Sequence, residues 1–213
     1  MNREKETFET WNKIAGLYQE KFMDLNLYND TYDFICDSII EDNPKILEIG
    51  CGPGNITRYL LSKRPDFDIF GIDFAPNMIQ LAEANNPTAR FATMDCRRIS
   101  ELKANYNAII CGFCLPFLTP EESVKLITDS YNLLYNNGLI YLSFVEGDPK
   151  ESDYKTGSSG DRVYFHYYVL DELTKHLSVN KFEEIKTFKV RFYKSETEFD
   201  IHTILIARKN NIA

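Results

Sequence analysis

Apolar residues at the start of the chain follow helical spacing. A first helix is expected over residues 4–22, where large apolar side chains recur every three or four positions: Trp11, Ile14, Tyr18 and Phe22. A second helix is expected over residues 30–40, and the Asn-Pro pair at 43–44 then interrupts the pattern. Together these helices predict an N-terminal helical cap over residues 1–42.

Between residues 43 and 146, short apolar runs alternate with amphipathic helical segments. Five strands are predicted, over 45–49, 68–72, 89–93, 106–111 and 139–145. The last helix before the fifth strand starts at Thr119-Pro120-Glu121-Glu122, a capping box with proline at the first helical position. This alternation predicts an α/β fold, a Rossmann-like doubly wound sheet that is mostly parallel and has helices on both faces.

The pattern changes after residue 146. Residues 146–162 are polar and rich in turn-forming residues, and the sequence leaves open whether they form a lid that excludes water or a surface loop. A short helix is expected over 169–177. Two alternating strands over 182–192 and 199–207 predict a C-terminal antiparallel hairpin at one edge of the sheet.

No linker long enough to separate two cores interrupts the chain, so residues 1–213 are predicted to form a single domain. Within it, residues 43–146 form the expected cofactor-binding core. Residues 147–213 supply the expected lid loop and C-terminal strands.

The composition narrows the class of protein. Of the 213 residues, 44% are hydrophobic and 26% are charged, which is typical of a globular protein. The net charge of −8 argues against binding to DNA or to anionic lipid. No apolar run is long enough to span a bilayer, and the N-terminus has no apolar leader, so a cytoplasmic protein is expected. The five cysteines are odd in number and several lie in apolar segments, which favours free thiols.

The most informative local pattern is ILEIGCGPGNIT at residues 46–57. A predicted strand runs into Gly50, Gly52 and Gly54 and then into a helix, a geometry that lets a ligand approach the backbone closely. The dinucleotide fingerprint requires a small residue where this chain has Asn55 or Thr57, and no Gly-Lys pair is present for a phosphate loop. An oxidoreductase that uses a nicotinamide cofactor is therefore disfavoured.

Residues 48–54, which read EIGCGPG, resemble the first motif of class I S-adenosylmethionine-dependent methyltransferases, of the type that acts on small molecules. The resemblance implies S-adenosyl-L-methionine as cofactor and S-adenosyl-L-homocysteine as product. It implies that Asp73 binds the two ribose hydroxyls and that Asp95 accepts a hydrogen bond from the adenine amino group. The Cys96 N–H would face an adenine ring nitrogen, with Phe74 and Met78 on either side of the adenine.

The resemblance extends to the fourth predicted strand, whose end would lie under the cofactor sulfur. The cofactor-binding residues implied in all are Glu48, Gly50, Gly52, Gly54, Asn55, Asp73, Phe74, Met78, Asp95, Cys96, Cys111, Gly112 and Phe113. At the end of that strand the chain reads CGFCLP, in place of the Asn-Pro-Pro-Tyr of the DNA and protein amide methylases. A DNA-methylating enzyme is therefore disfavoured.

Two residues are candidates for catalysis. His166 lies in the aromatic stretch RVYFHYY and is able to take a proton from an acceptor, or it pairs locally on a strand. Tyr18 either points into the site or packs as part of a helix face. Cys111 and Cys114 are either a redox pair or small residues of the cofactor floor. No metal site is expected, because the only histidines are His166, His176 and His202 and they lack metal-ligand spacing.

The expected reaction is an in-line displacement at the cofactor methyl group by an atom of a small molecule. The sulfonium already activates the methyl group, so the protein mainly positions the reactants, and a base is needed only for a protonated acceptor. Two alternatives remain open: a non-catalytic relative that binds a partner, and a methyltransferase with a protein or RNA substrate. The sequence does not decide between a monomer and a homodimer.

Overall fold

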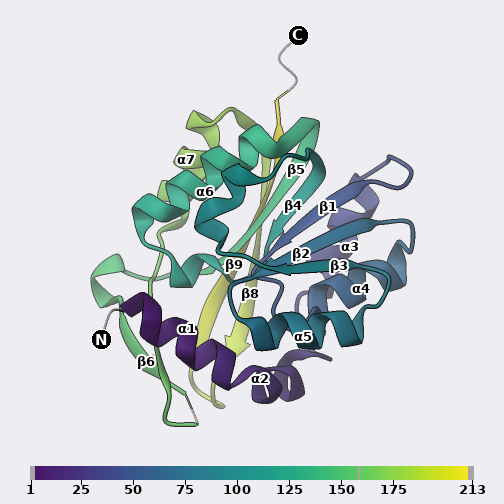
Figure 1. Ribbon diagram of the computed structural model, residues 1–213. Helices are drawn as coiled ribbons and strands as arrows, with labels where there is room; N and C mark the ends of the chain where they lie inside the picture. Colours follow the sequence, from purple (N-terminus) through teal and green to yellow (C-terminus); the bar gives the residue numbers. More distant parts are fainter. Residues whose placement is uncertain (1–2, 158, 211–213) are drawn as a thin grey trace.

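The computed structural model describes residues 3–157 and 159–210, and it contains a seven-stranded sheet (Figure 1). The strand order is β3-β2-β1-β4-β5-β9-β8. The strands are β1 (Lys45–Ile49), β2 (Asp68–Asp73), β3 (Arg90–Thr93), β4 (Tyr106–Cys111), β5 (Leu134–Val145), β8 (Phe182–Tyr193) and β9 (Phe199–Lys209). The pairs from β3 to β5 are parallel, whereas β9 pairs antiparallel with both β5 and β8. The predicted doubly wound sheet with a C-terminal antiparallel hairpin is therefore confirmed.

Helices cover both faces of this sheet because alternate strand residues enter two separate cores. Leu47 and Ile49 pack with residues of α6 and α7, whereas Ile46 packs with α3 and α4. The helices are α1 (Arg3–Lys13), α2 (Ala15–Phe22), α3 (Asn29–Ser38), α4 (Asn55–Lys63), α5 (Pro76–Asn85), α6 (Pro120–Leu133) and α7 (Leu170–Val179). Three short 3₁₀ helices are η1 (Cys96–Glu101), η2 (Leu115–Phe117) and η3 (Pro149–Glu151).

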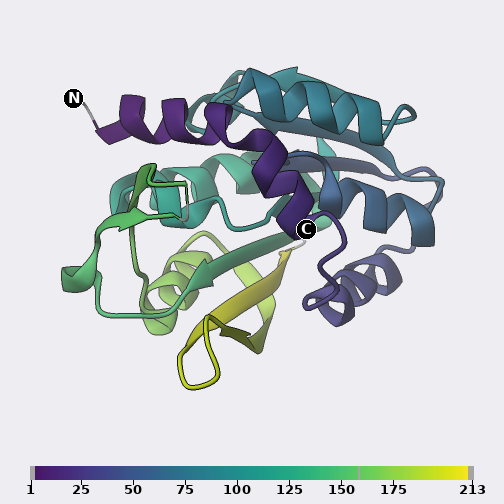
Figure 2. The same cartoon turned by 90° about the horizontal axis from the view of Figure 1, so that it is seen from below.

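The predicted single helix over 4–22 is wrong in one respect: the chain bends at Ile14 and forms two helices, α1 and α2. Gly16 lies just after the bend and carries no side chain to stabilise a continuous helix. The bend allows Trp11 and Tyr18 to contact each other edge to face, with ring centroids 5.5 Å apart. Figure 2 shows α1 and α2 at an angle to each other.

The polar stretch 146–162 is more regular than expected. It contains η3 and strand β6 (Asp153–Thr156), which pairs antiparallel with β7 (Arg162–Phe165) in a separate two-stranded sheet. This hairpin lies beside α1 in both views (Figures 1 and 2). Residue 158 of the predicted lid loop, and residues 1–2 and 211–213 of the predicted domain, lie outside the described residues. Within the described ranges, no helix is long and apolar enough to cross a membrane.

Candidate active site

A cavity of about 710 Å³ lies at the carboxyl ends of β1, β2 and β4. Its lining comes from the glycine-rich loop after β1, the ends of β2 to β4, the start of α6, helix α1 and strand β7. A volume of this size lies within the roughly 300–1,000 Å³ of small-molecule and cofactor sites. The location agrees with the general position of ligand sites in open α/β sheets.

The three glycines of the loop have different surroundings. All three have left-handed backbone angles, with φ of 67° at Gly50, 52° at Gly52 and 80° at Gly54. Gly50 and Gly52 line the cavity, whereas Gly54 packs against α5, where an added Cβ would lie 2.3 Å from Asn86 Nδ2. Gly52 therefore leaves the backbone open to a ligand, whereas an added Cβ on Gly50 would lie 3.1 Å from Cys114 Cβ and Gly54 is required for packing.

Asp73, the last residue of β2, contacts the glycine-rich loop through its side chain. Its carboxylate accepts hydrogen bonds from the backbone N–H of Gly52, at 3.0 Å, and of Ala75, at 2.9 Å. The side chain lines the cavity although only 8% of the residue is exposed. Burial raises the pKa of Asp73 to about 6. A nearly buried carboxylate held this way suits a diol, because it has acceptor positions left.

Glu48 lies near the end of β1, two residues before Gly50, and its side chain is buried beneath the glycine loop. Thr57 Oγ1 donates a hydrogen bond to its Oε2, whereas its Oε1 has no partner among the described residues. Burial raises the pKa of Glu48 to about 8. Glu48 does not line the cavity, so it lies below the glycine loop and does not contact a ligand in the cavity directly.

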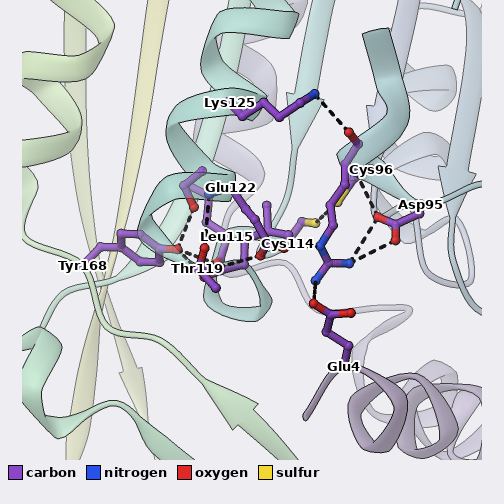
Figure 3. Close-up of polar contacts among 12 residues, drawn as sticks. Glu4, Asp95, Cys96, Cys114, Leu115, Thr119, Glu122, Lys125 and Tyr168 are labelled. Atoms are coloured by element: carbon purple, nitrogen blue, oxygen red, sulfur yellow. Dashed lines mark hydrogen bonds and ion pairs between the residues drawn. The ribbon is translucent and has the colours of Figure 1, made fainter. Parts of the chain in front are cut away.

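The opposite end of the cavity lies beyond β2 and β3, where Phe74, Met78, Asp95 and Cys96 line it together. Arg97 also lies there and joins the carboxylates of Asp95 and Glu122, which are labelled in Figure 3. Its guanidinium contacts both oxygens of Asp95 at 3.1–3.2 Å and Glu122 Oε1 at 2.5 Å. This end of the cavity is therefore lined by apolar surface on one side and by an ordered ion-pair network on the other.

Helix α1 forms a roof over the cavity. Phe8 packs edge to face on Phe74, and Trp11 packs in the same way on Phe117, with ring centroids 5.5 and 5.1 Å apart. Strand β7 holds the outer side of α1 through an ion pair between Arg162 and Glu6. The Thr10 hydroxyl also donates to the Arg162 carbonyl at 2.8 Å. The cavity is thus covered by side chains that are distant in sequence from the glycine loop.

Both predicted catalytic residues lie on the cavity wall. Tyr18 approaches the glycine loop, since a Cβ on Gly52 would lie 3.6 Å from Tyr18 Cε1. Burial raises the pKa of Tyr18 to about 12, so its hydroxyl stays protonated at neutral pH. His166 is half-buried beside Tyr164, and burial lowers its pKa, which favours the neutral imidazole. Tyr18 is therefore suited to donate a hydrogen bond and His166 to accept a proton.

Not every predicted residue lines the cavity. Eleven of them do: Tyr18, Gly50, Gly52, Asp73, Phe74, Met78, Asp95, Cys96, Gly112, Phe113 and His166. Glu48, Gly54, Asn55 and Cys111 lie behind that wall. Sequence reasoning missed wall residues of four other elements: Trp11 of α1, Arg97 of η1, Phe117 of η2 and Glu122 of α6. The capping box at Thr119–Glu122 was a usable signal, because it placed the Glu122 carboxylate at the start of α6, where it lines the cavity.

The cysteines are free thiols, as expected. Cys114 has its sulfur 3.7 Å from the sulfur of Cys96 at the cavity wall. Within the described part of the chain, no group of three or more His, Cys, Asp or Glu side chains has the arrangement of a metal site.

Comparison with known proteins identifies the kind of domain and its fold. Residues 46–138 match the family model described as a methyltransferase domain. The fold matches 1,6-didemethyltoxoflavin-N1-methyltransferase of Burkholderia thailandensis, solved with 1,6-didemethyltoxoflavin and S-adenosylhomocysteine, with a TM-score of 0.72 at 17% identity. That match covers 97% of this chain and 88% of the other. Residues 46–138 therefore match a methyltransferase domain, and the chain shares the fold of a solved methyltransferase. The resemblance seen in the glycine motif is therefore confirmed, and the cofactor of this family is S-adenosylmethionine.

Two curated relatives show how widely methyltransferase-domain proteins vary. The carboxy-S-adenosyl-L-methionine synthase of Campylobacter hominis is 24% identical over 149 residues, covering 67% of this chain and 63% of the relative. The tRNA N(3)-methylcytidine methyltransferase trm140 of Schizosaccharomyces pombe is 31% identical over 145 residues, covering 61% of this chain and 47% of the relative. The chain spans 42–63% of the length of these and a further curated relative.

The residues present fit the cofactor of this methyltransferase domain. Gly50, Gly52 and Asp73 line the cavity together, and a side chain on Gly52 would fill the space between the loop and Tyr18. Glu48 Oε1 is a buried polar atom without a partner among the described residues, and it lies beneath the same loop, outside the cavity wall. The acceptor positions of Asp73 suit the hydroxyl groups of a ligand.

Proposed function

We propose that this chain transfers a methyl group from S-adenosylmethionine to a small-molecule acceptor. The observation that carries the proposal is the covered cavity. Helix α1 and strand β7 close over the carboxyl ends of the strands, and the wall they form is rich in aromatic rings. A roof of this kind favours an acceptor that is small enough to be enclosed, because enclosure removes water from the reacting groups.

We propose the following cofactor contacts. Asp73 accepts hydrogen bonds from the ribose hydroxyls, and the backbone of Gly50 and Gly52 lies along the methionine part. At the other end, Asp95 accepts a hydrogen bond from the adenine amino group, and Phe74 and Met78 flank the ring. The supporting observation is that all these groups lie on one continuous cavity wall.

The bound cofactor supplies a methyl group that its sulfonium makes electrophilic. The protein excludes water with Trp11 and Phe117 and orients the acceptor against the end of β4, at Gly112 and Phe113. His166 takes a proton from an acceptor hydroxyl or amine, since burial keeps its imidazole neutral. Tyr18 donates a hydrogen bond near the glycine loop.

An RNA acceptor is the second candidate, because one relative at 31% identity is a tRNA methyltransferase. The net charge of −8 argues against it, since RNA binding depends on basic residues that neutralise phosphates. Methyl transfer to bulk tRNA, measured with radiolabelled cofactor, tests this candidate directly. Incorporation that falls steeply with added salt would favour the RNA acceptor.

Calorimetric titration with S-adenosylhomocysteine tests the cofactor, with NADH as a parallel control. We expect binding of S-adenosylhomocysteine and none of NADH. Asp73→Asn keeps the size of the side chain and its hydrogen bonds to the loop in part, and it is expected to weaken binding at least tenfold because a charged acceptor becomes neutral. Lack of binding by a folded wild-type sample overturns the proposed function.

A further inference from the structure

We propose that Arg97 is a positioning residue. It holds the Asp95 carboxylate in the orientation that accepts a hydrogen bond from the adenine amino group. This inference rests on the proposed function, because it concerns the contact of Asp95 with the cofactor. Arg97 itself is not assigned a contact with the reacting atoms.

The geometry between Arg97 and Asp95 carries the first step. The backbone N–H of Arg97 donates to Asp95 Oδ1 at 2.9 Å, and the side-chain Nη1 lies 3.2 Å from Oδ1 and 3.1 Å from Oδ2. One residue thus fixes the carboxylate both from the main chain and from the guanidinium. A carboxylate oxygen accepts more than one hydrogen bond, so Oδ2 keeps capacity for a ligand N–H.

Arg97 is in turn fixed from the other side by helix α6. Its Nε donates to Glu122 Oε1 at 2.5 Å, while Glu122 Oε2 accepts from the backbone N–H of Thr119 at 2.8 Å. Glu122 therefore serves the capping box with one oxygen and Arg97 with the other. Lys125 Nζ adds a hydrogen bond to the Arg97 carbonyl at 3.1 Å (Figure 3).

The exposure of these side chains shows why the network orders Asp95. The side chains of Arg97 and Glu122 are 26% and 23% exposed, whereas that of Asp95 is 38% exposed and lines the cavity. A planar guanidinium presents its donors in a fixed fork, so clamping it between two carboxylates also restricts the rotation of the more exposed one. Glu4 of the α1 roof lies 4.0 Å from the same guanidinium.

The test compares two ligands that differ by one group. The ligands are S-adenosylhomocysteine and its analogue in which hydrogen replaces the adenine 6-amino group. For the wild type we expect roughly tenfold tighter binding of the amino compound, the effect of about one hydrogen bond to a charged acceptor. In Arg97→Ala this preference falls to twofold or less, and the affinity for the deamino analogue stays within about twofold of wild type.

Three further variants separate positioning from general damage. Glu122→Gln retains a residue that completes a capping box but loses the charge that anchors Arg97, so a smaller loss of preference is expected. The double variant Asp95→Ala with Arg97→Ala should bind like Asp95→Ala alone. Arg90→Ala is the matched control, because Arg90 forms a comparable ion pair with Asp68, at 2.8 Å, at the amino end of the sheet.

Each outcome decides the inference. An unchanged preference in Arg97→Ala, or an equal loss for both ligands, overturns the role of Arg97 and leaves the proposed function standing. Failure of the wild type to bind S-adenosylhomocysteine overturns both. If Arg97→Ala does not fold by circular dichroism, Glu122→Gln and Arg97→Lys give the deciding comparison.

Discussion

At the scale of single residues, the glycine loop separates packing from ligand binding. Gly52 and Gly54 share a left-handed backbone, yet a methyl group on Gly52 points towards the cavity and Tyr18, whereas one on Gly54 meets α5. In the sequence motif both positions are simply glycine. Only their neighbours in space distinguish them.

The two alanine variants are therefore expected to differ. Gly54→Ala should lower the free energy of unfolding by about 2–4 kcal/mol, from left-handed strain and overpacking against Asn86. Gly52→Ala should cost about 1–2 kcal/mol and weaken S-adenosylhomocysteine binding at least tenfold, because its methyl group enters the cavity. Urea unfolding and calorimetric titration measure the two effects. Equal effects of the variants on both measurements would contradict the assignment.

The burial of Glu48 leads to a second prediction. Its pKa is raised to about 8 in the folded protein, against about 4.3 in an unfolded chain. A raised folded-state pKa adds stability that is fully present below the unfolded value and is lost as the pH rises through about 8.

Glu48→Gln should therefore gain stability relative to wild type between pH 5 and pH 9. We expect a relative gain of at least about 1.4 kcal/mol, the equivalent of one pKa unit. Urea unfolding at several pH values measures it, with Glu83→Gln on the exposed side of α5 as control. A difference between Glu48→Gln and wild type that stays constant with pH would show that Glu48 is not protonated in the folded state.

At the scale of elements, helix α1 depends on contacts with distant segments. Its end is joined to the start of α5 by two hydrogen bonds, from the Asn77 backbone N–H to Asn12 Oδ1 and from Asn77 Nδ2 to the Asn12 carbonyl. Strand β7 holds its outer side through Arg162 and Glu6. The roof is thus attached on both sides of the cavity.

Asn77→Ala removes one of these attachments. Losing one hydrogen bond of about 1 kcal/mol should enlarge the population with α1 open roughly fivefold. Trp11 is the single tryptophan and lies on α1, so acrylamide quenching of its fluorescence reports the opening. We expect stronger quenching in Asn77→Ala, reversed by S-adenosylhomocysteine, and no change in Asn105→Ala, whose amide bonds to the end of α6. Equal quenching in all three proteins would refute the attachment.

At the scale of the whole molecule, the cavity wall joins residues from positions 3 to 166. A ligand bound there contacts the N-terminal roof, the core sheet and the β6–β7 hairpin. Its binding energy is therefore expected to stabilise these parts together and not one segment alone.

Thermal unfolding with S-adenosylhomocysteine tests this coupling. At 100 times the dissociation constant, the ligand should add about 2.7 kcal/mol and raise the midpoint by roughly 5–11 °C for a chain of this size. The transition followed by Trp11 fluorescence and the one followed by far-ultraviolet circular dichroism should move together. A shift in only one of the two signals would show that roof and core unfold independently.

The sequence by itself determined the order of strands and helices and the glycine-rich site at the end of β1. Both depend on spacing over a few neighbouring residues: residues that alternate in and out of two cores, and glycines that tolerate a left-handed backbone. The strand ends that carry Asp73 and Asp95 followed from the same local pattern. Most of the residues predicted to bind the cofactor therefore line one cavity.

The tertiary structure alone decided what covers that wall and what orders it. The bend at Ile14, the hydrogen bond from Thr10 to the Arg162 carbonyl and the contacts of Arg97 with Asp95 and Glu122 involve residues up to 152 positions apart. Such contacts cannot be predicted from the periodicity of hydrophobic residues, because each depends on where separate elements pack and not on local spacing. The sequence therefore predicted where the cofactor binds, and the packing of α1 and β7 decided what covers that part of the cavity.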